Sequence, residues 1–250
     1  MKKKLLTIIT VVKNDERNIK KTLNSIFQQK NINYEYIIID GGSTDRTVEI
    51  IKKYKKKIKK MISEKDKGIY FAMNKGLKHA KGDVIVFCNS GDFFYKNSLS
   101  KVMQIFENNK NTSYVFGTVI RNYTKSKILK YGHEPGRIKY NFDFATSHTT
   151  GFFLKRKVYM KIGNYNTLFR ISADYDLYFR LIKKNFEGKS TPKNILVGNV
   201  ASGGFSSKHS FLDHCIEEAK IRIYNKQNFL FVLIIFFNSI IKNFNKIVFK

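Results

Sequence analysis

Two aspartates stand just after apolar runs of the sequence, where a carboxylate can meet a ligand. Asp40 follows Tyr34–Ile39 and Asp92 comes four residues after Val84–Cys88, in a chain with 19 acidic residues against 47 Lys and Arg. A carboxylate at such a place accepts hydrogen bonds from a nucleobase or ribose, or coordinates a hard divalent cation. The plainer alternative is that each aspartate caps the helix after it. Their joint placement at two strand ends favours a binding site.

The elements that must position these aspartates alternate between strand and helix. Leu5–Val12 predicts a first buried strand, and residues 19–27 carry apolar side chains at helical spacing. Tyr34–Ile39 predicts the second strand, and a helix over 68–80 leads into a third strand at Val84–Cys88. This alternation favours an α/β fold with a Rossmann-like, mostly parallel sheet flanked by helices. Ligands of such sheets bind beyond the carboxyl ends of the strands, where both aspartates lie.

A further helix is expected after the turn that closes the second strand. Its apolar face would be formed by Ile51, Tyr54, Ile58 and Met61, while the seven lysines within 52–60 cover a solvated face. A short strand candidate follows at its end.

Several classes of protein are excluded by motif and composition. No G-x-G-x-x-G follows a predicted strand and no G-x-x-x-x-G-K-[ST] occurs, so dinucleotide oxidoreductases and P-loop NTPases are excluded. Cys88 and Cys215 show no metal-ligand spacing, which argues against a structural zinc or a disulfide scaffold and suits a reducing compartment. With 15 Gly, 2 Pro and 42% hydrophobic residues, the chain is neither collagen-like nor disordered.

The formal net charge of +28 predicts attraction to an anionic partner. Nucleic acid, an acidic membrane face and phosphorylated substrates all satisfy this condition, and so does a general compositional drift with no functional meaning. A basic nucleic-acid-binding protein therefore stays a rival interpretation, and it requires neither Asp92 nor Asp174.

A series of ordered motifs resembles the family 2 inverting glycosyltransferases of the GT-A fold. These motifs are residues 10–14 (TVVKN), 36–47 (YIIIDGGSTDRT), 66–76 (DKGIYFAMNKG), 89–92 (NSGD), 148–156 (HTTGFFLKR) and 172–180 (SADYDLYFR). The resemblance covers about residues 5–210. The sequences of these motifs are most similar to the branch of the family that assembles bacterial surface polysaccharides such as O-antigen and capsule.

The resemblance implies a site for a nucleotide-sugar donor, formed by residues at the strand ends and at the start of a helix. The implied donor-binding residues are Thr10, Val12, Asp40, Lys67, Asn74, Ser90 and Gly91. Asp92 is the implied ligand of a Mg²⁺ or Mn²⁺ ion on the donor diphosphate. Asn89 and Gly91 replace acidic positions of the family's metal motif, so one carboxylate is left for the cation, and a donor-binding but inactive homologue is a further alternative.

The resemblance also implies a catalytic base, Asp174, on the acceptor side. Inversion in one step requires a carboxylate that removes the proton of the acceptor hydroxyl while the anomeric carbon is attacked from the face opposite the leaving group. Asp176 is the rival base, although it can instead stabilise the first turn of a helix that starts near Asp174. His148 is expected on the acceptor side, where it would orient the acceptor or serve the structure alone.

The ends of the chain predict a peripheral protein. The apolar run Leu5–Val12 is too short for the apolar region of a signal peptide, and no small-residue cleavage site follows it. We therefore expect a buried strand and no secretion signal. Residues 1–226 are expected to form the glycosyltransferase domain, and 227–250 a basic amphipathic tail. In this tail we expect a stripe to face the membrane interface, the alternative being a helix packed against the domain or a partner subunit; its members are Phe237, Ile240, Ile241, Phe244, Ile247 and Val248.

The resemblance, together with these patterns, implies an enzyme that transfers a sugar, from a donor expected to be UDP-linked, to a hydroxyl of a lipid-linked glycan. It would act with inversion, in surface polysaccharide synthesis, in the cytoplasm at the inner face of the cell membrane.

Overall fold

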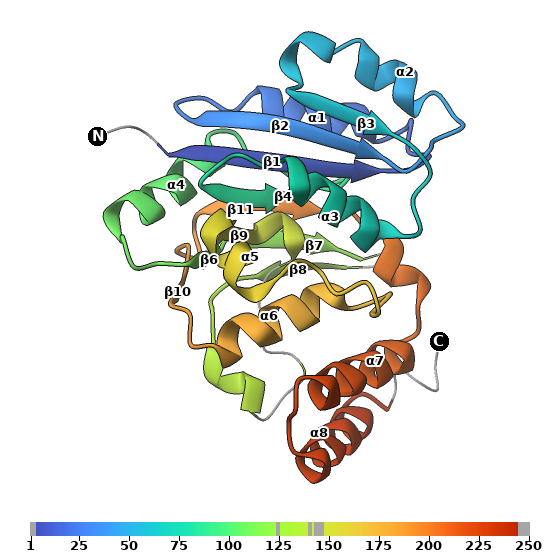
Figure 1. The fold of residues 1–250 in the computed structure, drawn as a ribbon, viewed down its shortest axis with the longest axis vertical. Coiled ribbons are helices and arrows are strands. Elements are labelled where there is room, and N and C mark those ends of the chain that lie inside the picture. The colour runs from blue at the N-terminus through green and yellow to red at the C-terminus, as the bar shows by residue number, and fades with distance from the viewer. Residues whose placement is uncertain (1–3, 124–125, 140–141, 143–147, 245–250) are drawn as a thin grey trace.

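The computed structural model describes residues 4–123, 126–139, 142 and 148–244. Its centre is a seven-stranded sheet in the order β10-β6-β9-β4-β1-β2-β3 (Figure 1). The strands are β1 (Leu5–Val12), β2 (Asn33–Asp40), β3 (Lys60–Ser63), β4 (Val84–Phe87), β6 (Tyr114–Phe116), β9 (Phe152–Lys155) and β10 (Gly188–Ser190). Of the described strands in this sheet, β9 alone runs antiparallel to its neighbours. The expected mostly parallel sheet is therefore confirmed.

Helices cover both faces of this sheet. One face packs against α1 (Ile19–Phe27), α2 (Thr47–Lys52) and α4 (Ser98–Asn108). The other face packs against α3 (Ile69–His79), α5 (Arg156–Ile162) and α6 (Ala173–Lys183), which lie in front of the strands in Figure 1. The helices expected over 19–27 and 68–80 are confirmed.

The pleat of β1 divides the core between these two layers. Leu6 and Ile8 are fully buried in the cluster that includes α1 and α4, whereas Ile9 and Val11 belong to the cluster that includes α3 and α6. Successive side chains of a strand point to opposite faces, so a central strand covered on both faces reads as a continuous apolar run. The near-unbroken apolar sequence of β1 has this cause.

A smaller second sheet continues the fold beyond Asp92. Its order is β5-β11-β7-β8, formed by β5 (Phe93–Phe94), β11 (Leu196–Val200), β7 (Thr118–Asn122) and β8 (Lys127–Lys130). Short 3₁₀ turns complete the description: η1 (Lys55–Lys57), η2 (Pro135–Lys139), η3 (Thr149–Gly151) and η4 (Phe205–Lys208). Because β5 begins directly after Asp92, this sheet holds one side of the loop on which Asp92 lies.

The prediction of one long helix with Ile51, Tyr54, Ile58 and Met61 on one face is wrong. Helix α2 ends at Lys52, the chain turns through η1, and Met61 lies in β3. Like charges three or four residues apart destabilise a helix, and seven lysines crowd this segment. The apolar side chains still pack on the core, Ile51 from α2, Tyr54 and Ile58 from the turn, and Met61 from β3.

Two antiparallel helices, α7 (Phe211–Tyr224) and α8 (Phe229–Lys242), end the described chain, and we call them the C-terminal hairpin. They lie at the end of the molecule furthest from α2 in Figure 1. The expected boundary between 226 and 227 falls in the turn between them. No helix in the described part of the chain has the length and hydropathy needed to cross a bilayer.

The stripe predicted for the tail needs one correction. Ile240 packs against the core, so it does not face outward with Phe237 and Ile241, which are exposed. Ile247 and Val248 lie outside the described residues.

We expect Gly82→Ala to lower the free energy of unfolding by about 1–3 kcal/mol. A Cβ on Gly82 would lie 2.6 Å from the backbone nitrogen of Thr7 and 2.8 Å from the carbonyl oxygen of Leu5, and neither can move without disturbing β1. Gly204→Ala is the matched control, since no atom of the described residues beyond its chain neighbours lies within 4 Å of its Cβ position, and its change should not exceed about 0.5 kcal/mol. Urea denaturation measures both; equal effects would contradict the tight approach at Gly82.

Candidate active site

The carboxylate of Asp40 organises the turn that follows β2. It is fully buried, and its Oδ2 accepts hydrogen bonds from the amides of Gly42 (3.2 Å) and Ser43 (3.0 Å) and from Ser63 Oγ (2.7 Å), while Ser43 Oγ donates to Oδ1. These bonds join the ends of β2 and β3. Asp40 thus lies at the expected edge of the sheet, and its carboxylate is hydrogen bonded to the turn after β2 and to Ser63 on β3.

Thr10 and Val12 fix the end of β1 beside this turn. The Thr10 hydroxyl donates to the carbonyl oxygen of Cys88 (2.7 Å) and accepts from the hydroxyl of Tyr36 (2.8 Å), all in the interior. Val12 pairs with Asp40, and its carbonyl oxygen accepts the amide of the residue after Asp40. Their side chains are buried, so a ligand at this edge would meet β1 through its main chain.

The loop between β4 and β5 is held by α1 and the loop before it. Ser90 Oγ donates to Asp15 Oδ2 (2.6 Å), and the amide of Gly91 donates to Thr22 Oγ1 (3.0 Å). Gly91 has a φ of +92°, which favours glycine, and a Cβ there would lie 3.2 Å from the Cβ of Ala201. The tight turn brings Asp92 to the edge of the sheet.

Asp92 is buried where segments from both halves of the chain meet. Its Oδ1 accepts the amide of Ala201 (2.9 Å), its Oδ2 accepts the Thr150 hydroxyl, and His148 Nδ1 lies 3.9 Å from Oδ2. Burial raises the pKa of Asp92 to about 7, opposed by these hydrogen bonds and by the charges of Arg121 and Lys21. The residue can therefore hold either a proton or a cation near neutral pH.

Burial and the positive charge of Arg121 lower the pKa of His148 to about 3. Its imidazole is thus neutral, and its approach to Asp92 is not a charged pair. The structure brings His148 and Thr150 to Asp92, although only His148 was expected on this side of the site.

The donor set around Asp92 fits a hard cation that takes further oxygens from its ligand. Asn89 Oδ1 is buried without a hydrogen-bond partner among the described residues, and Asp92 adds a carboxylate. Within the described ranges, no three His, Cys, Asp or Glu side chains come together as a metal site. Mg²⁺ commonly uses one or two protein oxygens together with phosphates and water, which this set allows.

Sequence reasoning missed an acidic pair at the entry to α3. Lys75 Nζ lies 2.6 Å from both Asp66 Oδ1 and Glu64 Oε1. Asp66 Oδ2 is buried without a described hydrogen-bond partner, and it faces the Cβ position of Gly41 at 3.5 Å. This oxygen is an acceptor available at the same edge as Asp40. The signal was present in the motif 66–76, whose first residue is Asp66.

Two other residues of this motif have different surroundings. Lys67 is exposed in the loop before α3. Asn74 is occupied: its Nδ2 donates to the carbonyl oxygen of Tyr165 (2.8 Å) and its Oδ1 accepts the Tyr165 amide (3.0 Å). Asn74 thereby ties α3 to the loop that leads to α6.

Asp174 lies in the first turn of α6, where an acidic side chain is expected to be favourable. Its Oδ1 accepts the amide of Tyr175 (2.9 Å) and lies 3.1 Å from the hydroxyl of Tyr70 on α3. Burial raises the pKa of Asp174, while these two hydrogen bonds oppose the rise. No described residue is hydrogen bonded to Oδ2, so this oxygen keeps its acceptor capacity.

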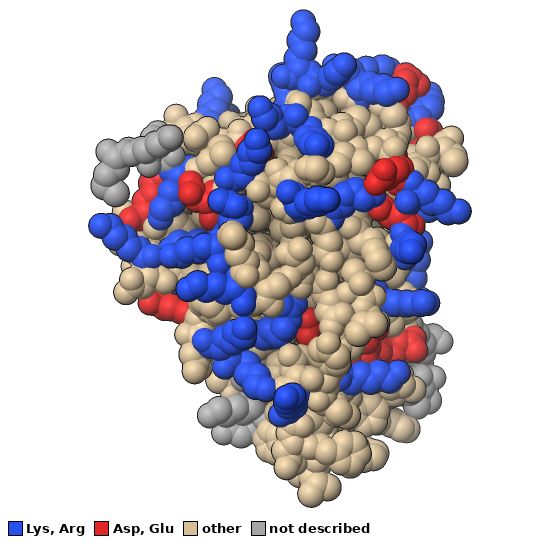
Figure 2. Space-filling view, viewed as in Figure 1, with Lys and Arg blue, Asp and Glu red and all other residues tan. Residues whose placement is uncertain are grey.

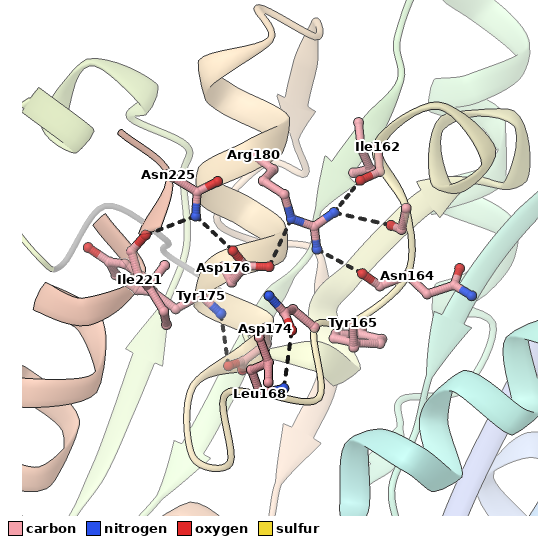
Figure 3. A network of polar contacts seen from close by, with 12 residues as sticks. Ile162, Asn164, Tyr165, Leu168, Asp174, Tyr175, Asp176, Arg180, Ile221 and Asn225 are labelled. Atoms are coloured by element: carbon pink, nitrogen blue, oxygen red, sulfur yellow. Dashed lines mark hydrogen bonds and ion pairs between the residues drawn. The ribbon is translucent and has the colours of Figure 1, made fainter. Parts of the chain in front are cut away.

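Asp176, also in the first turn of α6, has a different environment (Figure 3). It is fully buried; Oδ2 accepts from Arg180 Nε (2.8 Å) and Oδ1 from Asn225 Nδ2 (2.8 Å). Arg180 also donates to the carbonyl oxygens of residues 162–164. The described contacts of Asp176 therefore join α6 to α7 and to the loop after α5.

The loop before α6 is held by a residue that sequence reasoning did not select. Glu217 on α7 accepts the amides of Arg170 (2.8 Å), Ile171 (2.7 Å) and Ser172 (2.6 Å). Nothing in the sequence around Glu217 connects it to residues 45 positions earlier. The C-terminal hairpin thus fixes the backbone from which Asp174 projects.

This geometry agrees with the comparisons to known proteins. Residues 7–177 match Glycosyl transferase family 2, which is more than half of the chain, and the chain belongs to this family. An uncharacterized glycosyltransferase of Haemophilus influenzae is 26% identical over 190 residues, 72% of this chain and 63% of that protein. A PGL/p-HBAD biosynthesis glycosyltransferase of Mycobacterium bovis is 28% identical over 162 residues, 63% of this chain and 62% of that protein. The chain therefore spans less than two thirds of the length of these relatives.

Solved structures share the fold. TarS 1–349 of S. aureus superposes with a TM-score of 0.68 at 15% identity, covering 96% of this chain and 72% of that one. Mannosyltransferase PcManGT of Pyrobaculum calidifontis, in complex with GDP-Man and Mn²⁺, gives 0.65 at 15% identity, covering 96% and 70%. The α/β fold expected from the sequence, with its C-terminal helices, is confirmed as GT-A-like. Family membership does not favour the nucleic-acid interpretation.

We expect Tyr70→Phe to raise the pKa of Asp174 further above its ordinary value. The lost hydroxyl is a hydrogen-bond donor that favours the ionised carboxylate, so its removal favours the protonated form. NMR titration of the Asp174 side-chain carboxyl carbon measures the change. Tyr178→Phe is the control, because the Tyr178 hydroxyl is buried without a described hydrogen-bond partner. An unchanged or lower pKa in Tyr70→Phe would contradict the assigned contact.

Proposed function

We propose that this protein transfers a sugar from a UDP-sugar to an acceptor hydroxyl with inversion at the anomeric carbon. The observation behind the proposal is that two carboxylates whose pKa is raised by burial, Asp92 and Asp174, lie in the two halves of a family 2 glycosyltransferase fold. The choice of donor is supported by the shared fold of TarS, solved in complex with UDP-GlcNAc (TM-score 0.67, 14% identity, covering 98% of this chain and 76% of that one).

In this proposal Asp174 is the general base. Its Oδ1 is held by Tyr70 and by the start of α6, which leaves Oδ2 to accept the proton of the acceptor hydroxyl as that oxygen attacks the anomeric carbon. A raised pKa makes the carboxylate a stronger base than an exposed aspartate. Asp176 is left out of the chemistry because both of its oxygens are engaged in the interior.

The donor would lie along the carboxyl ends of β1, β2 and β4. Asp40 and its turn, the main chain at Thr10 and Val12, and Asp66 offer hydrogen-bonding groups to the nucleoside, while Lys67, Asn74, Ser90 and Gly91 border the same loops. Asp92 and Asn89 would hold Mg²⁺ or Mn²⁺. When bound, such a cation neutralises the charge of the departing diphosphate.

The acceptor and its location extend the same proposal. His148 and Thr150 border the acceptor side, next to Asp92. The acceptor would be a lipid-linked glycan of a bacterial surface polysaccharide such as O-antigen or capsule, met at the cytoplasmic face of the cell membrane. The net charge of +28 supports attraction to an anionic membrane face and to a diphosphate donor. Residues 1–226 would act as the catalytic domain and 227–250 as the membrane-binding tail.

UDP should raise the melting temperature, and more so with Mn²⁺ or Mg²⁺ present. Ligand binding to the folded state stabilises it by about 2.7 kcal/mol at a hundredfold excess over Kd. A thermal shift assay with UDP, UDP plus metal, and duplex DNA separates the interpretations. No shift with UDP and metal, together with a shift by DNA, would overturn the transferase proposal in favour of nucleic-acid binding.

Three isosteric variants test the roles of the carboxylates in release of UDP from a panel of UDP-sugars. Asp174→Asn should lower kcat by about 10² to 10⁴ while UDP affinity stays within a few fold, because only the base is lost. Asp92→Asn should weaken metal and donor affinity and recover in part with excess Mn²⁺. Asp176→Asn should instead lower stability, by about 3 kcal/mol, because it breaks a buried ion pair.

The opposite pattern would correct the assignment. If Asp176→Asn is folded, binds UDP and is inactive while Asp174→Asn turns over normally, the base is Asp176. If the wild-type chain binds UDP but releases none from any UDP-sugar, it is a donor-binding homologue without activity.

A further inference from the structure

The outer surface of α8 carries large apolar side chains that nothing in the described chain covers. Leu230, Ile234, Phe237 and Ile241 on α8, with Phe244 two residues after its end, are 58–74% exposed, and we call the five residues the outer face of α8. They recur every three or four residues, which places them along one side of the helix. Monomeric proteins rarely leave so many large apolar side chains together in water, so this face marks a contact site.

The opposite side of α8 is already used by the fold. Val232 and Ile235 are buried, and Phe231, Phe236 and Ile240 pack against the core with α7. Cys215 Sγ on α7 lies 3.7 Å from Ser239 Oγ on α8. The helix therefore has a fixed inner side, and the direction of its outer face is set by the fold.

The charge around the hairpin selects the partner. After Glu218 the sequence has no acidic residue, and Lys220, Lys226 and Lys242 are exposed on or beside the two helices. Figure 2 shows an uncharged lower end of the molecule, where α8 lies in Figure 1, with Lys and Arg side chains above it. An apolar surface bordered by cations suits the interface of an anionic bilayer, whose head groups attract Lys near the surface.

A second copy of the chain fits this face less well. Two copies joined through α8 would bring the same lysines together, on molecules that each carry a net charge of +28. Such self-association is opposed by like charges, whereas an anionic lipid surface is attracted by them.

We infer that the outer face of α8 inserts into the interfacial region of an anionic membrane, with α8 lying in the membrane plane. At 14 residues the helix is about 21 Å long, and it lies on the bilayer instead of crossing it. This inference deepens the proposed function, because it names the surface by which the enzyme would meet a lipid-linked acceptor. Through Glu217 and Asn225, the same hairpin holds the loop and helix that carry Asp174.

The chain contains no Trp, so a single introduced Trp reports its own environment without background. Phe237→Trp and Ile241→Trp should show a blue-shifted emission on addition of phosphatidylglycerol vesicles, while Leu168→Trp, on an exposed apolar residue outside the hairpin, should not. Vesicles of phosphatidylcholine alone should give a smaller shift. Equal shifts at all three positions, or none, would overturn the inference.

Removal of the outer face should have a matching effect on binding. The triple variant Ile234→Gln, Phe237→Gln, Ile241→Gln should lower the partition coefficient onto phosphatidylglycerol vesicles by at least about tenfold. The control Met160→Gln, Leu168→Gln changes side chains that are 76% and 72% exposed elsewhere, and should leave it unchanged. Lys226→Gln and Lys242→Gln should each lower it about fivefold at low salt. Undiminished binding by the triple variant would overturn the inference.

Two parallel measurements separate this inference from its rivals and from the proposed function. Sedimentation that shows a dimer, which the triple variant disrupts, together with no vesicle binding, would assign the face to a second copy and overturn the inference. The UDP thermal shift is measured on the same variants and should be unchanged. If UDP gives no shift in the wild type while the vesicle results hold, the proposed function fails and the membrane surface stands.

Discussion

Burying a carboxylate costs free energy unless hydrogen bonds or positive charges replace the water it loses, and this constraint divides the acidic residues of the site. Asp40 and Asp176 are fully buried, and both oxygens of each accept hydrogen bonds from the protein. Burial outweighs compensation at Asp92 and Asp174, so the pKa of each is raised. Asp40 and Asp176 connect elements of the fold, whereas Asp92 and Asp174 keep a raised pKa, in Asp92 despite hydrogen bonds to both of its oxygens.

Two carboxylates, Asp176 and Glu217, connect parts of the chain that a sequence cannot place together. Asp176 joins α6 to Asn225, and Glu217 joins α7 to three amides before α6. Arg222, fully buried on α7, donates to the hydroxyl of Tyr175 (2.7 Å). Residues on and just after α7 therefore hold α6, the helix that carries Asp174, and α8 packs on α7. Asp174 and the C-terminal hairpin are therefore parts of one packed body.

Sequence patterns predicted the elements where local physics dominates. Leu5–Val12 is β1 to the residue, because a strand buried on both faces is apolar throughout. The pattern was misleading at 52–60, where apolar spacing suggested a long helix but repulsion among the lysines favoured a turn. In α8 almost every side chain is apolar, so spacing alone could not tell that Ile240 faces inward and Ile234 outward. Packing against α7 decides this.

The reversed direction of β9 has a consequence for how the site is assembled. Parallel strands deliver to the rim of the sheet only the segments that leave them, whereas β9 delivers the segment that enters it, η3 with Thr150. The pairing of Val86 with Phe153 therefore sets which hydroxyl reaches Asp92. A slip of one residue in this pairing would turn every side chain of β9 to the opposite face. The register of one short strand therefore determines how the N-terminal and C-terminal halves of the chain meet at Asp92.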